Sequence, residues 1–353
     1  MKDLTPNRCL ASVRFGGRYR LIDFTLSNFI NSDITKVAIF PSERFRSLMD
    51  HLGSGKEWDL DRQTGGGLYI LPPIHSNDTI KGDLQSFYDH IEIFKRTPAE
   101  NVIISPGVHV NKIDFNAVIQ EHRQSGADIT VLYKDYCGSP VQKPFYHKCE
   151  VNETGDIQDI EFFTAPKLGD HVMLETYIIN KDLLISFIEE CIKNEEYSFL
   201  KDVVKANLQL CKVKGYHYTD AMFFIHSTES FYQSQLQFLN PEIMQNFFND
   251  NWEVFTKIKH EAPARFGSTS SVSHSLIANG CEIDGIVENS VLFRGVKIHR
   301  GAVVRNSIIM QKGEIKEGAY VENVIADKQV TISQHRAIKG DSEPIVIRKL
   351  EVL

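Results

Sequence analysis

The last third of the chain repeats itself, and this repeat constrains the fold more than any other feature. Four similar segments begin at His274 (HSLI), Asn289 (NSVL), Asn306 (NSII) and, more weakly, Asn323 (NVI). Their spacings are 15, 17 and 17 residues, close to three six-residue strands per copy. The glycines between them are Gly280, Gly285, Gly295, Gly301, Gly313 and Gly318. The pattern predicts a triangular parallel β-helix filled by stacked Val, Ile and Leu; the alternative is a β-meander with glycine turns.

The first two-thirds of the chain alternates segments typical of strands with segments typical of helices. The segments KVAIF, VIIS and DITVLYK predict short buried strands over 36–40, 102–105 and 128–134. Helices are predicted over 114–125, which has Asp114 at its start and Gly126 after its end, and over 182–193. Such alternation favours a mostly parallel sheet covered by helices.

The 353 residues are enough for two domains. We therefore expect an α/β domain over residues 1–240, a linker over 241–265 and a β-helix domain over 266–353.

Composition excludes several classes of protein. The 39 Lys and Arg against 46 Asp and Glu give a net charge of −7, which argues against nucleic-acid and anionic-membrane surfaces, although a local basic pocket is compatible with it. The six cysteines form no CxxC pair, which argues against a zinc site or a redox dithiol and favours reduced cysteines. No apolar run approaches about 18 residues and no apolar signal core begins the chain. A soluble cytoplasmic protein is predicted.

The densest segment is FGGRYRLIDFTLSNFINSDI, at residues 15–34. Gly16 and Gly17 let the backbone turn tightly and approach a ligand, and Arg18 and Arg20 offer positive charge to a phosphate group. An apolar face at helical spacing follows. Taken alone, the segment is better explained as a turn and an amphipathic helix with solvated arginines.

The whole string, however, resembles bacterial glucose-1-phosphate adenylyltransferases, the ADP-glucose pyrophosphorylases. The resemblance covers nearly the whole chain and includes SLIANGCEIDGIVENSVLFRGVKI at residues 275–298. It implies a nucleotidyltransferase-like α/β domain joined to a left-handed parallel β-helix, a role in glycogen precursor synthesis, and a tetramer. Active relatives begin with a buried strand and a glycine-rich phosphate-binding loop. This sequence starts just after the matching point, so we expect both to precede Met1 in the natural chain.

The chain departs from active relatives at the metal-binding positions. Where they have Gly-Asp-His, with the aspartate on Mg²⁺, this chain has Val108 between Gly107 and His109. Active relatives have a second aspartate near the end of the domain. The matching string here is MFFIHS, with Phe224 at the position of that aspartate. Because Mg²⁺ needs oxygen ligands, no catalytic acid, metal or cofactor is predicted for this chain, and Mg²⁺ is expected in a catalytic partner.

Other family positions are altered as well. A Lys-Pro pair is replaced by Leu10 and Ala11, and the Glu-Lys pair that binds the sugar phosphate is replaced by Thr164 and Ala165. The string KGDLQ keeps a cation and a glycine at Lys81 and Gly82. An alternative is that the alignment slips by one residue, so that nearby acids such as Asp114 or Asp220 serve instead.

This combination resembles the glycogen biosynthesis protein D branch of the family, whose members have little or no activity and modulate a catalytic subunit. We therefore expect a non-catalytic or weakly active regulatory subunit in a hetero-tetramer with the catalytic subunit. A sugar-phosphate or nucleotide ligand is expected at the residual ligand-binding residues Gly16, Gly17, Arg18, Arg20, Lys81 and Gly82.

Two alternatives remain open. The first is an active adenylyltransferase with an altered metal site. The second, disfavoured, is an acyltransferase that uses His274 or His299 of the β-helix.

Overall fold

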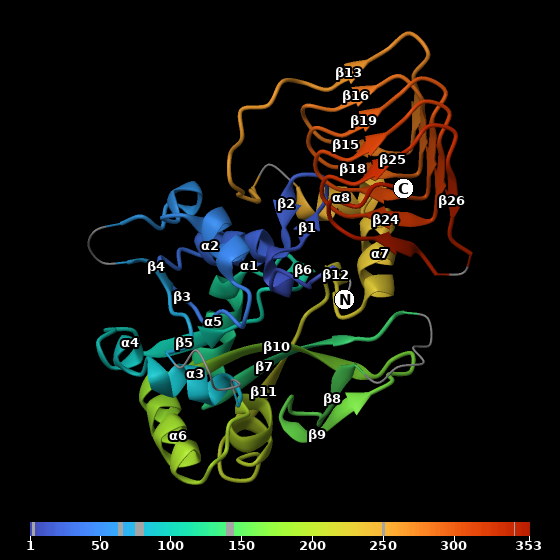
Figure 1. The fold of residues 1–353 in the computed structure, drawn as a ribbon. Helices are drawn as coiled ribbons and strands as arrows, with labels where there is room; N and C mark the ends of the chain where they lie inside the picture. Colours follow the sequence, from blue (N-terminus) through green and yellow to red (C-terminus); the bar gives the residue numbers. More distant parts are fainter. Residues whose placement is uncertain (2–3, 63–65, 75–80, 139–144, 249–250, 342) are drawn as a thin grey trace.

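The computed structural model describes residues 1, 4–62, 66–74, 81–138, 145–248, 251–341 and 343–353. Figure 1 shows an α/β part with a β-helix beside it, and the helices α7 (Thr228–Gln237) and α8 (Pro241–Phe247) next to the β-helix. Within the described ranges, no helix combines the length and apolar character needed to cross a bilayer.

The largest sheet of the α/β part has the strand order β11-β7-β10-β8-β9, with β5 paired to β10. The three predicted strands are confirmed, with β3 at Lys36–Ile39, β5 at Asn101–Ile104 and β7 at Ile129–Asp135. The parallel expectation is confirmed for β11 (Val213–His217) on β7 and for β3 on β4 (Gly67–Ile70).

The remaining pairs of this sheet correct that expectation, because they are antiparallel. β8 (Tyr146–Val151), β9 (Ile157–Thr164) and β10 (His171–Asn180) follow one another closely, and β8 pairs antiparallel with both β9 and β10. A parallel crossover needs a dozen or more residues, and the connection between β8 and β9 is too short for one. β10 then also pairs antiparallel with β5 and β7, so the sheet is mixed.

Helices cover both faces of this sheet. On β7, Val131 packs with α3, α6 and η3 on one face, and the next residue, Leu132, packs with α1, α2 and α5 on the other. α5 begins after the N-cap Asp114, which accepts a hydrogen bond from the Asn116 N–H, and ends at Gly126 with φ 61°, as predicted. The helices are α1 (Leu21–Asn31), α2 (Arg46–Leu52), α3 (Asp83–Asp89), α4 (Glu92–Lys95), α5 (Phe115–Ser125), α6 (Lys181–Lys193), the 3₁₀ turns η1 (Leu10–Ser12) and η2 (Lys56–Trp58), and the π-helix η3 (Phe199–Lys205).

The C-terminal repeat forms the predicted parallel β-helix, with three sheets of five strands. One sheet contains β13 (Arg265–Phe266), β16 (Glu282–Ile283), β19 (Lys297–Ile298), β22 (Glu314–Ile315) and β25 (Thr331–Ile332). The second contains β14 (Ser271–Ser273), β17 (Ile286–Glu288), β20 (Val303–Arg305), β23 (Tyr320–Glu322) and β26 (Ala337–Lys339). The third contains β15 (Leu276–Ile277), β18 (Val291–Leu292), β21 (Ile308–Ile309), β24 (Val324–Ala326) and β27 (Ile345–Ile347).

The repeated Asn-Ser pairs form one corner of the β-helix. Asn289 and Asn306 have φ values of 45° and 44°, a left-handed conformation that asparagine tolerates well, and the Asn289 amide donates to Asn306 Oδ1 at 2.8 Å. Beside them, Ser290 Oγ accepts the Ser307 N–H at 3.0 Å. The sequence repeat is therefore a ladder of side chains that satisfies the corner backbone from coil to coil.

One apolar core joins the α/β part to the β-helix. It combines Phe15 of the hairpin β1 (Arg14–Phe15) and β2 (Tyr19–Arg20) with residues of α7, α8 and three coils. The ring of Phe15 contacts that of Phe238 with centroids 5.0 Å apart, and Phe293 and Ile308 supply the β-helix side. This shared core packs the two domains against each other.

Gly17 allows this close approach. Its φ is +76°, and a Cβ there would lie 2.2 Å from Leu276 Cδ2. We expect Gly17→Ala to lower the free energy of unfolding by about 2–4 kcal/mol, because the substitution combines backbone strain with overpacking. Gly169→Ala is the matched control, since Gly169 has φ +86° and nothing within 4 Å of the added Cβ. Urea unfolding of both variants measures the difference, and equal losses would contradict the packing role.

Candidate functional site

The turn after β5 carries Val108 and rests on helix α1. Thr25 of α1 donates from Oγ1 to the Pro106 carbonyl at 3.1 Å. A Cβ on Gly107 would lie 2.5 Å from Ile22 Cδ1, so the turn passes close to the side chain of the helix at this point. α1 therefore fixes the position of Val108.

Strand pairing brings Phe224 to the same place. β12 (Met222–Phe223) pairs antiparallel with β6 (Val110–Asn111). As a result the ring of Phe224 lies against that of His109, the neighbour of Val108, with centroids 5.1 Å apart. Phe224 therefore contacts the residue next to Val108.

Five ring side chains gather around these positions, and we call them the aromatic cluster: Phe145, Tyr146, His109, Phe224 and His226. Ring centroids are 5.3 Å apart between Tyr146 and Phe224, and 4.8 Å apart between Phe145 and His226. His226 Nε2 lies 3.0 Å from Tyr146 Oη. The neighbours of Phe224 in this cluster are therefore rings, and none of them carries a carboxylate.

The imidazoles of the aromatic cluster are uncharged at neutral pH. Burial, followed by the nearby His226, lowers the pKa of His109 to about 4. Burial also lowers the pKa of His226 to about 4, and it raises the pKa of Tyr146 to about 12. The cluster therefore offers no charge to a phosphate group.

The residues gathered here do not fit Mg²⁺, which needs oxygen ligands. Among the described residues, no group of three His, Cys, Asp or Glu side chains has an arrangement that could hold a metal ion. The alternative acids lie elsewhere: Asp114 caps α5, and Asp220 lies in the loop before β12. No metal-dependent step can be derived for this chain's own residues.

The two residues at the positions of the sugar-phosphate pair, Thr164 and Ala165, also carry no charge. Thr164 ends β9 and donates from Oγ1 to the Tyr146 carbonyl at 3.4 Å, and Ala165 is exposed. Lys81 packs on Tyr197, with Nζ 4.8 Å from the ring centroid and 3.1 Å from Oη. A Cβ on Gly82 would lie 2.2 Å from the Tyr197 carbonyl oxygen, so Lys81 and Gly82 help to pack the start of α3.

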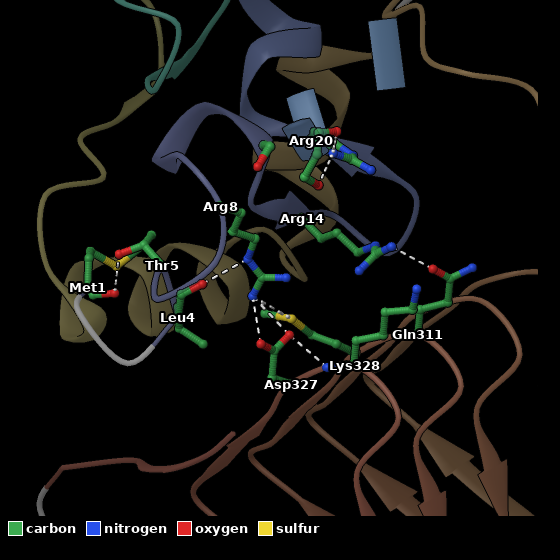
Figure 2. Close-up of polar contacts among 12 residues, drawn as sticks. Met1, Leu4, Thr5, Arg8, Arg14, Arg20, Gln311, Asp327 and Lys328 are labelled. Carbon is green, nitrogen blue, oxygen red and sulfur yellow. Dashed lines mark hydrogen bonds and ion pairs between the residues drawn. The ribbon is translucent and has the colours of Figure 1, made fainter. Parts of the chain in front are cut away.

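A second region is strongly cationic. A pocket of about 490 Å³ lies between the N-terminal residues with the β1–β2 hairpin and the coils of the β-helix (Figure 2). Its lining includes two carboxylates, Asp50 and Asp327. Eleven cationic side chains also line it: Arg8, Arg14, Arg18, Arg20, Arg46, Lys257, Lys259, Arg294, Lys312, Lys328 and Lys349. We call it the basic pocket.

Polar contacts across the basic pocket join the two domains. Figure 2 shows Arg8 reaching Asp327, with Nη2 2.9 Å from each carboxylate oxygen. Arg14 Nη2 donates to Gln311 Oε1 at 2.5 Å. Within the α/β part, Arg20 at the start of α1 donates to the Ser47 carbonyl at 2.6 Å.

Burial, and after it neighbouring positive charge, lowers the pKa values of several lining residues. Burial, followed by Arg20 and Arg8, lowers the pKa of Arg14 to about 10. Burial and then Arg14 lower the pKa of Lys328, and burial lowers that of Lys259. An anion entering this pocket would relieve the mutual repulsion of these cations.

Comparisons with known proteins agree with both parts of the fold. The nucleotidyl transferase model matches residues 1–222, and the GlmU-like C-terminal hexapeptide model matches residues 257–344. The chain is 37% identical to the glycogen biosynthesis protein GlgD of Bacillus subtilis over 351 residues, which cover 99% of this chain and 92% of that protein. It is also 35% identical to the glucose-1-phosphate adenylyltransferase of Thermotoga maritima over 308 residues, which cover 85% of this chain and 72% of that protein.

The chain belongs to the glucose-1-phosphate adenylyltransferase family. A further similarity, to the GlgD protein of Geobacillus stearothermophilus, is 37% identity over 308 residues, covering 86% of this chain and 78% of that protein.

The six residues predicted to bind a ligand in this family member do not lie together: three line the basic pocket and three lie elsewhere. Gly17, Arg18 and Arg20 line the basic pocket. Gly16 packs under Phe238, which would lie 2.9 Å from an added Cβ, while Lys81 and Gly82 contact Tyr197.

Most of the residues that line the basic pocket of this family member were not predicted from the sequence. Arg8 and Arg14 precede the glycines, and the remaining missed cations come from α2, the segment before the β-helix, and its coils. The only signal in the sequence was indirect, because a net charge of −7 left a local basic pocket open.

The two histidines of the acyltransferase alternative have contacts that belong to the β-helix. His299 Nε2 lies 2.8 Å from Glu314 Oε1 of the next coil. His274 has φ 43° and occupies the corner position that Asn289 and Asn306 occupy in later coils. Neither position requires an acyl-transfer role to explain it.

Proposed function

We propose that this chain is a non-catalytic or weakly active regulatory subunit in glycogen biosynthesis. It associates with a catalytic glucose-1-phosphate adenylyltransferase, which makes ADP-glucose and pyrophosphate from ATP and glucose 1-phosphate, and it modulates that enzyme. The names of its relatives support this pathway, since they include both glycogen biosynthesis proteins and glucose-1-phosphate adenylyltransferases.

The observation that carries the proposal is the replacement of both metal-binding acids. Phe224 packs against His109, the neighbour of Val108, and none of these side chains offers a carboxylate. Nucleotidyl transfer depends on neutralising the charge that develops on the phosphates, and the metal ion is a main contributor. The catalytic partner therefore supplies the Mg²⁺ site, and this chain acts through binding.

The basic pocket gives such a subunit a place to bind a ligand. Its cations come from both domains, so an anion held there contacts the α/β part and the β-helix together. Phosphate oxygens accept hydrogen bonds from guanidinium and ammonium groups, which favours a sugar phosphate or a nucleotide. Ligand binding at this place would bias the arrangement of the two domains, and through them the contact with the catalytic partner.

Reconstitution with the catalytic subunit tests the proposal. The two chains are co-expressed, separated by size exclusion, and assayed for ADP-glucose formation from ATP and glucose 1-phosphate with Mg²⁺. We expect co-elution as a hetero-tetramer and a change of about fivefold or more in kcat/KM of the catalytic subunit.

The control replaces this chain with the same mass of serum albumin, which excludes a non-specific stabilising effect. Separate elution of the two chains, together with unchanged kinetics, would rule out the regulatory role.

A further inference from the structure

The basic pocket contains a largely buried ion pair between the two domains. Among the described lining residues, Arg8 and Asp327 are the pair of opposite charge in direct contact, and their side chains are 11% and 4% exposed. Asp327 is fixed on the β-helix, because its Oδ1 accepts the Lys328 N–H at 2.7 Å and its own N–H donates to the Ile347 carbonyl at 2.9 Å. A carboxylate is therefore held rigidly inside a cationic pocket.

The contact uses only part of the Arg8 guanidinium. Nη2 serves both Asp327 oxygens, and Nε donates to the Leu4 carbonyl at 2.8 Å. This is not the parallel two-nitrogen geometry that makes arginine–carboxylate pairs strongest. A phosphate group offers the same kind of oxygen acceptor and carries more negative charge at neutral pH.

Most of the cations around Arg8 have no carboxylate partner of this kind. Nine lining residues lie within ion-pair distance of no carboxylate in the described part of the chain: Arg14, Arg18, Arg20, Arg46, Lys257, Lys259, Lys312, Lys328 and Lys349. An incoming anion is attracted by these groups and repelled by Asp327. The carboxylate thus opposes binding at the place where the two domains meet.

We propose that Asp327 is an internal counter-anion that competes with a ligand phosphate for Arg8 and thereby sets the affinity of the basic pocket. This rests on the ligand-binding role given to the pocket above. On binding, Arg8 exchanges the carboxylate of Asp327 for a phosphate oxygen, with no proton transferred. The exchange releases a contact between the N-terminal residues and the β-helix, which links occupancy of the pocket to the domain arrangement.

The test is Asp327→Asn, which removes the charge and keeps the shape and one oxygen acceptor for Arg8. Inorganic pyrophosphate is the probe, and its Kd is measured by calorimetry on the full chain. We expect about tenfold tighter binding than for the wild type, because one repulsive charge near the anion is removed. The gain should shrink as salt is raised, because screening weakens the repulsion.

Glu317→Gln is the matched control, since it removes one exposed negative charge from the β-helix outside the lining of the pocket. Its pyrophosphate Kd should stay within about twofold of the wild type, because the change is distant and solvent-screened. If Asp327→Asn folds poorly, Arg8→Gln combined with Asp327→Asn removes both charges and leaves no unpaired buried ion. That double variant should lose the gain, because Arg8 no longer binds the anion.

Unchanged or weaker binding by a folded Asp327→Asn variant would overturn the proposal and make Asp327 a residue that merely positions Arg8. Wild-type protein that binds no pyrophosphate would overturn it as well. Failure of the proposed function would give a different result. The anion would bind as expected, but this chain would neither bind nor modulate the catalytic subunit.

Discussion

Purified alone, the chain should form ADP-glucose at least about a thousandfold more slowly than a family member with aspartates at both metal-binding positions. The loss of the metal's contribution to transition-state stabilisation accounts for an effect of this size. The measurement is ADP-glucose formation from ATP and glucose 1-phosphate over a range of Mg²⁺ concentrations. The rate should also show no saturable dependence on Mg²⁺, because Val108 and Phe224 supply no ligand.

Val108→Asp combined with Phe224→Asp separates this explanation from that of an enzyme with an altered metal site. The double variant restores the acids but not the charged pair replaced by Thr164 and Ala165, so we expect activity to stay below about one-hundredth of the active relative. The control is the wild type in the same assay. A wild type that already turns over normally, with the double variant no different, would show that another metal site serves this chain.

Arg14→Gln should weaken pyrophosphate binding by about tenfold without a comparable loss of stability. Arg14 lies in the basic pocket among like charges, and burial together with Arg20 and Arg8 lowers its pKa to about 10. Removing it takes a cation from the anion and also relieves repulsion in the protein itself. The free energy of unfolding should therefore fall by no more than about 1 kcal/mol, which corresponds to the lost hydrogen bond to Gln311.

Arg336→Gln is the matched control, because Arg336 is exposed on the β-helix and does not line the basic pocket. Calorimetry with pyrophosphate and urea unfolding are measured on both variants. Equal affinity of Arg14→Gln and wild type would show that the anion does not bind in the basic pocket. A large loss of stability would show that Arg14 mainly holds the two domains together.

Local sequence patterns predicted the elements of the fold well. The β-helix followed from the spacing of the Asn-Ser pairs, because each coil repeats one corner and that corner requires a left-handed residue such as Asn289. Helix α5 followed from Asp114 and Gly126 for a similar local reason. The antiparallel pairing of β8, β9 and β10 was not expected, because strand direction depends on the length and path of the connections and not on the composition of the strand.

The two regions of the candidate site differ in how far the sequence revealed them. The altered metal positions were found through the resemblance to a family, one residue at a time. The contact of Phe224 with His109, the neighbour of Val108, was decided by the β6–β12 pair. The basic pocket was largely missed, since Arg8 and Asp327 lie more than three hundred residues apart and no local pattern connects them.

By itself, the sequence determined the β-helix, the alternation of strands and helices, and the absence of acids at Val108 and Phe224, because each of these depends on residue type and short-range spacing. Only the tertiary structure decided where the positive charge gathers. The net charge of −7 describes a chain with more acids than bases, yet packing of the β1–β2 hairpin against the β-helix collects eleven cations around one pocket. Electrostatic interactions act through space, so a cationic pocket assembled from both ends of a chain exists only once the domains have packed.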